Sequence, residues 1–416
     1  MLPLSTRVAP AGSRPVPRRP ARHRRDAETG RRRLALRSVE DTQPRKGLSV
    51  PVVTILDEAG VLLEDDQRAV VRYVIQDGYG ADVIFAAGTT GEWDRVDNGV
   101  RQSVIQICTE EVAKANALLA GTTRPVGREV EMWAGVTAPS AEETLENLDL
   151  AISCGADAAV LAPLSIAGID DPVRFVARDV ADLLDARTRR IPVFLYDNAD
   201  IAIDPKVPHI RTRQVKALSR LDFVRGIKVS APRKVLGNYT KAARSFNDRG
   251  EFAIYVGDAM LIFDLFRPRR GPFGTLAEHW NRWRLHGAVP AGVVAGPANA
   301  LPREWARAWQ TCRAGDVERM DEVREVLEDF RAGTHSTSGR RTIACLKRAL
   351  LHLGVVSSDT VASGTPKLAR PDAERFDEVF ARVREKAART VRAPWVSVAP
   401  AGPALAAARE SGLRRV

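Results

Sequence analysis

The chain has 416 residues, of which 44% are hydrophobic and 28% are charged, a composition typical of a soluble globular protein with one large domain or two smaller ones. No stretch approaches the roughly 18 uninterrupted apolar residues of a membrane-spanning helix, which argues against a helical membrane protein. We therefore expect a soluble protein without a membrane partner.

The net charge of +11 is concentrated at the N-terminus. Residues 1–46 hold thirteen basic and four acidic side chains and supply nine of the eleven net positive charges. A basic Pro- and Arg-rich arm on a nearly neutral body predicts a disordered tail, and we do not expect nucleic acid as a principal partner. Two alternatives stay open: electrostatic contact of the tail with nucleic acid or an acidic protein, and an organelle transit peptide, although the tail contains few serines.

The cysteines and histidines are scattered along the sequence. The four cysteines form no CxxC pair, and the six histidines show no HxH or HExxH spacing. This pattern favours reduced, buried thiols in a cytoplasmic protein over a disulfide framework or a zinc site. We expect no metal and no cofactor.

After the tail, short apolar runs alternate with helical patterns. Strands are expected over 52–56, 81–87, 132–136, 158–162, 191–196, 223–229, 252–256 and 290–295. Helices are expected between them over 65–76, 97–117, 140–154, 172–184, 213–219, 233–246 and 259–266. Eight strands in strict alternation with helices predict an α/β fold, a (β/α)8 TIM barrel over 47–300, with a doubly wound open sheet as the alternative architecture.

The remaining segments are expected to surround this barrel. Amphipathic helices predicted over 303–331, 341–353 and 373–386 form a C-terminal helical appendage within 301–390, and residues 391–416 are expected to be loose. Residues 267–287 are an insertion between the seventh and eighth strands. A lid or specificity loop and an added surface helix explain that insertion equally well.

Three of the expected strands end in residues suited to catalysis, and in a (β/α)8 barrel the C-terminal strand ends form the active site. The fifth strand ends at Tyr196 and the sixth at Lys228. The second strand ends in a turn of sequence Gly88, Thr89, Thr90, Gly91 and Glu92. The backbone N–H groups and hydroxyls of this turn are suited to hold a small carboxylate.

Lys228 is the residue on which the chemical prediction depends. Because side chains alternate along a strand, Val224, Gly226 and Lys228 are expected on one face, and a packed Val224 would place Lys228 inside the barrel. Burial lowers the pKa of a lysine, and a neutral amine attacks carbonyl carbons. Gly226 is expected to leave space for a substrate. The alternative is a lysine whose amine reaches solvent.

Several short motifs along the chain extend this interpretation, and they occur in the same order as in one known family. They are Gly88 to Glu92, Leu195-Tyr196-Asp197-Asn198, Gly226-Ile227-Lys228, Gly257-Asp258, and Gly292-Val293-Val294 followed by Asn299. With them, residues 48–383 resemble the dihydrodipicolinate synthase/N-acetylneuraminate lyase family of class I aldolases.

The resemblance implies a Schiff-base lyase or aldolase acting on pyruvate or a related 2-keto acid and an aldehyde. It implies that Lys228 forms the imine, that Tyr196 moves protons, and that Thr89 and Thr90, in the turn with Gly88 and Gly91, bind the substrate carboxylate. It also implies a homodimer or homotetramer. Glu92 and Asp258 are expected to be structural.

Two departures from the family pattern narrow the prediction. Where the synthase has a second relay tyrosine, this chain has Pro163, Leu164 and Ser165, and where the synthase has a carboxylate-binding arginine it has Ile201 between Asp200 and Asp204. An acidic, arginine-free rim disfavours a dianionic second substrate. Two alternatives remain, 4-hydroxy-tetrahydrodipicolinate synthase of lysine biosynthesis and a catalytically silent barrel that binds a ligand or partner.

Overall fold

The computed structural model describes residues 44–120, 129–232, 235, 239, 252–267, 290–335 and 341–390. Four expected features lie wholly or almost wholly outside these residues: the N-terminal tail, the helix over 233–246, the insertion over 267–287 and the C-terminal end after 390. The boundaries proposed between domains stay predictions.

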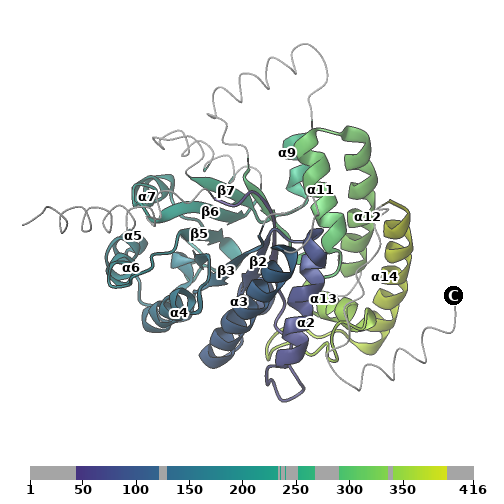
Figure 1. Ribbon diagram of the computed structural model, residues 1–416, viewed down its shortest axis with the longest axis horizontal. Helices are drawn as coiled ribbons and strands as arrows, with labels where there is room; N and C mark the ends of the chain where they lie inside the picture. Colours follow the sequence, from purple (N-terminus) through teal and green to yellow (C-terminus); the bar gives the residue numbers. More distant parts are fainter. Residues whose placement is uncertain are drawn as a thin grey trace, which may run out of the picture.

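The described strands form a closed parallel barrel in chain order (Figure 1). They are β1 Gly47–Pro51, β2 Val83–Ala86, β3 Glu131–Gly135, β4 Ala158–Leu161, β5 Val193–Asn198, β6 Val224–Ser230, β7 Ala253–Val256 and β8 Gly292–Val294. Pairing of Gly47 with Gly292 joins the first strand to the last. The predicted (β/α)8 barrel is therefore confirmed, and the open sheet is excluded.

Helices surround the barrel on the outside. Those between strands are α2 Glu64–Ile75, α3 Asn98–Ala120, α4 Ala141–Cys154, α5 Pro172–Phe175, α6 Ala181–Asp185, α7 Thr212–Leu218 and α9 Leu261–Phe266. Those after β8 are α11 Pro302–Ala314, α12 Val317–His335, α13 Thr342–His352 and α14 Arg370–Thr390, which gather on one side of the barrel (Figure 1). Within the described residues, no helix is both long and apolar enough to cross a membrane.

Local sequence signals predicted both ends of α4 correctly. One expected helix, however, forms two separate helices in the structure. Ser140 caps α4 by accepting a hydrogen bond from the Glu143 N–H, and Gly155 ends it with φ 95°, a conformation that glycine adopts without strain. The helix expected over 303–331 breaks at Gly315, where φ is 70°. The two helices α11 and α12 contact each other on either side of this turn.

The first strand lies earlier in the chain than predicted. Residues 52–56 are buried but outside β1, and Leu56 forms only isolated antiparallel bridges to Leu62 and Thr360. The apolar run there reflects burial, and burial alone does not distinguish a strand from a packed loop.

Two apolar cores hold the barrel together. The larger one lies between the strands and the helices, and the smaller one fills the barrel interior. In the interior, Trp133 stacks on Phe194 with centroids 4.2 Å apart, and Tyr255 meets both rings edge-on at 4.9 and 5.5 Å. These three rings form an aromatic layer inside the barrel, and Phe194 in this layer belongs to the same strand as Tyr196.

Candidate active site

A cavity of ≈ 530 Å³ lies at the C-terminal ends of the barrel strands. Its polar lining residues are Thr89, Thr90, Tyr196, Asn198, Asp200, His209, Lys228, Ser230 and Asp258. The structure thus brings together the four side chains predicted from the strand ends. Gly88 and Gly91 shape the turn behind the two threonines and do not line the cavity.

Lys228 faces the barrel interior, but not for the reason expected. Val224 packs in the outer core with Ile227 and Val229. The register of β5 and β6 shifts between the pairs Val193 with Val224 and Phe194 with Gly226, so one extra residue in β6 reverses the alternation. The prediction that Val224 and Lys228 share a face is wrong. Lys228 points inward because it pairs with Tyr196 and alternates with Ile227 and Val229.

The Lys228 amine is enclosed by aromatic rings. The residue is 5% exposed, and its Nζ lies 3.8 Å from the centroid of the Tyr196 ring and 4.8 Å from that of Phe85. Burial lowers the pKa of Lys228, while the nearby Tyr196 oxygen acts in the opposite direction. The net lowering increases the fraction of neutral amine, which is the nucleophilic form.

The Tyr196 hydroxyl is the centre of a hydrogen-bond cluster. It lies 3.1 Å from the Thr89 Oγ1, accepts a hydrogen bond of 3.1 Å from the Asn198 amide and one of 3.4 Å from the Ser230 hydroxyl. Burial acts to raise the pKa of Tyr196, but the Lys228 charge and the hydrogen bonds from Ser230 and Thr89 outweigh it, and the pKa is lowered. A phenol with a lowered pKa beside a buried amine is suited to give and take protons.

Tight packing places the two threonines at the cavity. Residues Thr89–Gly91 form one 3-10 turn directly after β2. A side chain at Gly88 would come within 2.8 Å of the Phe85 ring, and one at Gly91 within 3.0 Å of the Val52 carbonyl oxygen. The Thr54 hydroxyl donates a 2.7 Å hydrogen bond to the Gly91 carbonyl. Both glycines are therefore needed for close packing of the turn against β2 and against residues 52–54.

Glu92 ties this turn to the C-terminal appendage. Its Oε2 lies 2.5 Å from the Lys347 Nζ, its Oε1 accepts a hydrogen bond from the Ala362 N–H, and both charged side chains are fully buried. Glu92 does not line the cavity, consistent with the structural role expected for it. Asp258, given the same expectation, does line the cavity.

Sequence reasoning missed three polar groups at the site. Asn198 and Ser230 each lie two residues beyond a predicted catalytic residue on the same strand, so the alternation of β5 and β6 contained the signal. His209 follows in a loop without periodicity. Its Nδ1 lies 2.8 Å from the Oδ2 of Asp197. Asp197 is fully buried, and its Oδ1 accepts a hydrogen bond from the Ile210 N–H.

Gly226 does not leave space for a substrate, as had been expected. A side chain there would meet the Ala253 carbonyl oxygen at 2.5 Å and the Phe194 ring at 2.7 Å. The space is thus already occupied by Phe194, and Gly226 allows the aromatic floor of the barrel to form.

The predicted acidic rim is only partly at the cavity. Asp200 lines it, whereas Asp204 lines a neighbouring cavity with Pro163 and Leu164. Ile201 is partly buried and packs against the interior core. Among the described lining residues there is no arginine and no tyrosine besides Tyr196. The described part of the chain also holds no group of three His, Cys, Asp or Glu side chains that could bind a metal ion.

Comparisons with known proteins agree with this architecture. Residues 44–163 match the dihydrodipicolinate synthetase family, a segment that includes the Thr89–Thr90 turn and ends before Tyr196 and Lys228. A 4-hydroxy-tetrahydrodipicolinate synthase from Syntrophotalea carbinolica is 37% identical over 76 residues, which are 18% of this chain and 25% of that protein.

Solved structures extend the likeness to the whole barrel. Dihydrodipicolinate synthase from Bacteroides thetaiotaomicron superposes with a TM-score of 0.63 at 20% identity, over 82% of this chain and 99% of that one. A prophage protein of the dihydrodipicolinic acid synthase family from E. coli K12, solved in complex with pyruvate, gives 0.62 at 18% identity, over 82% and 98%. The structural matches show the fold of the barrel, and together with the family match over residues 44–163 they agree with the resemblance drawn from the motifs.

Proposed function

We propose that this protein is a Schiff-base lyase or aldolase that joins or cleaves pyruvate, or a related 2-keto acid, and an aldehyde. The observation that carries the proposal is the buried Lys228 amine against the Tyr196 ring at 3.8 Å, with Thr89 hydrogen-bonded to the same phenol at 3.1 Å. A lysine of lowered pKa, a proton-transfer group and a hydroxyl-lined turn in one cavity are the parts that imine catalysis requires.

Each residue has a defined part in the proposed reaction. Thr89 and Thr90 bind the substrate carboxylate and direct the keto carbon toward Lys228. The neutral Nζ adds to that carbon, Tyr196 supplies a proton to the departing oxygen, and water leaves as the C=N bond forms. Loss of a proton from the adjacent carbon gives an enamine, which forms a C–C bond with the aldehyde carbon. The aldehyde oxygen takes up a proton, and water then releases the product and the free amine. Cleavage follows the same steps in reverse.

The lining residues favour a neutral or cationic aldehyde over an anionic one. Asp200 and Asp258 line the cavity, and among its described residues no arginine is present to bind a second carboxylate. For this reason the synthase of lysine biosynthesis is the less supported function. The silent barrel is disfavoured because burying an unused lysine amine costs stability without benefit.

Borohydride trapping tests the imine directly. Sodium borohydride reduces a pyruvate imine to a stable secondary amine, which peptide mass spectrometry would locate on Lys228. We expect the adduct in the wild type and its loss in Lys228→Ala. Lys386→Ala is the control, because Lys386 lies outside the cavity and is partly exposed, so its loss should disturb neither the site nor the fold. Absence of an adduct with pyruvate and with a panel of other 2-keto acids would favour the silent barrel.

Assembly and location remain part of the proposal. We infer a homodimer or homotetramer in the cytoplasm, with the helical appendage at the subunit contacts. Sedimentation velocity of the full chain tests the assembly, and a monomer would contradict it. Removal of residues 1–43 is expected to leave trapping on Lys228 intact, since every described lining residue of the cavity lies at Pro51 or later in the chain.

A further inference from the structure

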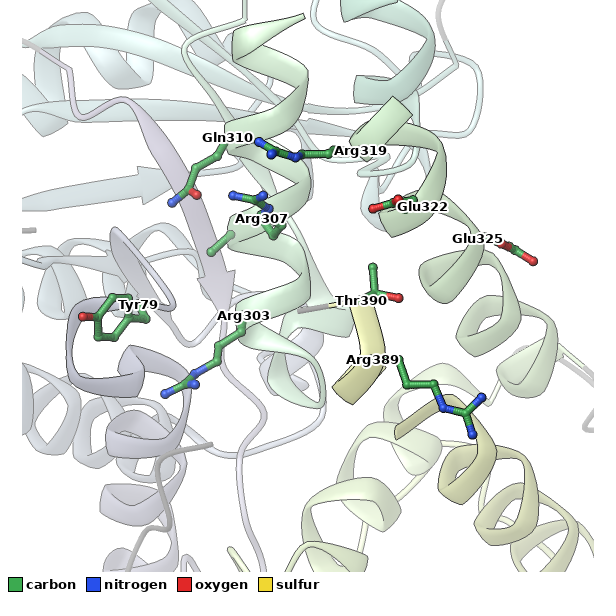
Figure 2. Close-up of a pocket in the computed structure, with 10 residues that line it drawn as sticks. Tyr79, Arg303, Arg307, Gln310, Arg319, Glu322, Glu325, Arg389 and Thr390 are labelled. Carbon is green, nitrogen blue, oxygen red and sulfur yellow. The ribbon is translucent and has the colours of Figure 1, made fainter. Parts of the chain in front are cut away.

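A second cavity, of ≈ 730 Å³, lies against α11, α12 and α14 (Figure 2). It shares no lining residue with the catalytic cavity. Its charged lining residues are Arg303, Arg307, Arg319, Arg389, Glu322 and Glu325. The arginines exceed the glutamates, so the cavity attracts anions.

Several of these charges are already balanced by neighbours. Glu325 pairs with Lys386 at 2.9 Å, Arg319 lies 3.4 Å from Asp316, and Arg389 pairs with Glu385. Glu325 and Arg389 also point away from α11, whereas Arg319 extends from α12 toward Arg307 (Figure 2). Arg307 and Arg319 therefore lie together at one end of the cavity, with Glu322 on α12 beside them, whereas Arg303 extends toward Tyr79 (Figure 2).

Arg303 is a buried cation that lacks a bonded counterion within the described residues. It is 4% exposed, and its Nε and Nη1 are buried without a hydrogen-bond partner there. Its Cζ lies 5.7 Å from the centroid of the Tyr79 ring. Burial lowers the pKa of Arg303, and the nearby Glu304 carboxyl acts against that lowering without forming a salt bridge. A buried guanidinium beside an open cavity, without a bonded carboxylate, costs free energy that a bound anion would offset.

We propose that this cavity binds the phosphate group of a small phosphorylated metabolite. Arg303 and Arg307 are four residues apart on one face of α11, and neither forms an ion pair with another described residue. Their two positive charges match the charge of about −1.5 to −2 on a phosphate monoester at pH 7. Guanidinium groups bind phosphate through paired hydrogen bonds. A monocarboxylate would neutralise only one of the two arginine charges.

Titration calorimetry with the full chain tests the proposal, with inorganic phosphate and glycerol 3-phosphate as probes in chloride buffer of constant ionic strength. Arg307→Gln is expected to weaken binding of both probes by about tenfold or more, because a charge-assisted hydrogen bond is lost. Arg307→Lys should retain part of the affinity. Arg313→Gln is the matched control on the same helix: Arg313 is exposed and does not line the cavity, so affinity should not change.

Arg303→Met separates a binding role from a structural one. We expect this variant to lose phosphate binding while its melting temperature without phosphate does not fall, since the replaced cation forms no ion pair with the described part of the chain. A large fall in melting temperature would show that Arg303 is structural. Equal binding by the wild type and Arg307→Gln would overturn the site. Tighter binding of citrate than of glycerol 3-phosphate would overturn the phosphate assignment. None of these outcomes depends on the imine chemistry at Lys228.

Discussion

Glu92 and Lys347 form an ion pair of 2.5 Å in which both side chains are fully buried, although 255 residues separate them in the chain. Glu92 ends the turn that carries Thr89 and Thr90, and Lys347 lies on α13 and also donates a hydrogen bond to the Thr360 carbonyl oxygen. The pair therefore couples the geometry of the catalytic turn to the docking of the C-terminal helices.

Breaking this pair on one side should be costly. Lys347→Met leaves the Glu92 carboxylate buried without its counterion, and we expect a loss of about 3–5 kcal/mol in the free energy of unfolding, measured by urea denaturation. Adding Glu92→Gln removes the stranded charge and keeps an oxygen for the Ala362 N–H, so the double variant should be more stable than Lys347→Met alone.

Lys386→Met provides the control for that experiment. Lys386 also forms two ion pairs, but its side chain is 34% exposed, and loss of exposed pairs of this kind costs about 0–1 kcal/mol. Similar losses for Lys347→Met and Lys386→Met would contradict a special contribution from the buried pair.

Replacing Tyr196 should distinguish its role in proton transfer from the role of Lys228 as the nucleophile. In Tyr196→Phe we expect turnover to fall by about 10²- to 10⁴-fold, as for loss of a general acid–base group, while pyruvate is still trapped on Lys228. The Tyr196 oxygen acts to raise the pKa of Lys228, so its removal lowers that pKa further. Because only the neutral amine reacts, the rate of trapping falls as pH drops through the Lys228 pKa. The pH at which the trapping rate falls on the acid side, the acid limb of the pH–rate curve, should therefore be lower in the variant. An acid limb displaced to higher pH would contradict the assigned contact.

The alternation of strands and helices in the sequence was enough to predict the barrel and the convergence of the candidate catalytic residues on one rim. Once eight strands alternate with helices, parallel pairing places the ends of β2, β5 and β6 on one rim, and Thr89, Tyr196 and Lys228 must converge there. The capping signals at Ser140 and Gly155 likewise fixed their helix ends, because those hydrogen bonds are local.

What could not be predicted depends on contacts distant in sequence. The extra residue in β6 has no local signal, since its register is set by β5. The Phe194 ring occupies the space at Gly226, and sequence gives no information about which neighbour fills a glycine gap. His209 lies in a loop, which has no periodicity. The partner of Glu92 is Lys347, which lies on α13, far along the chain. These features arise from packing between elements, which a single sequence does not encode in its periodicity.

Gly226 offers a direct test of the packing argument. A methyl group there meets the Ala253 carbonyl oxygen and the Phe194 ring, so Gly226→Ala should destabilise the protein by about 1–3 kcal/mol. Adding Phe194→Leu should recover part of that loss. The control is Gly99→Ala on α3, where the added methyl has its nearest neighbour at 3.3 Å and helix propensity favours alanine by up to about 1 kcal/mol. An unchanged stability of Gly226→Ala with a raised KM for pyruvate would instead indicate that Gly226 makes room for substrate.

The preference for a neutral or cationic aldehyde should change when a cation is added at Ile201. This side chain is partly buried against the interior core, next to Asp200 at the cavity, so an arginine there can bury its stem and extend its guanidinium toward the second substrate. In Ile201→Arg we expect kcat/KM for an anionic aldehyde to rise by about tenfold relative to a neutral one, as one charge-assisted hydrogen bond allows, and to rise less at high salt.

Ile203→Arg distinguishes a local effect from a general one. Ile203 is 56% exposed and lines the neighbouring cavity, not the catalytic one, so the same added charge should leave aldehyde selectivity unchanged. Pyruvate trapping on Lys228 should be equal in both variants, because imine formation precedes the aldehyde step. If both variants favoured the anionic aldehyde equally, net charge and not the position of Ile201 would determine selectivity. If neither did, the second substrate would lie elsewhere in the cavity, nearer His209 and Asp258.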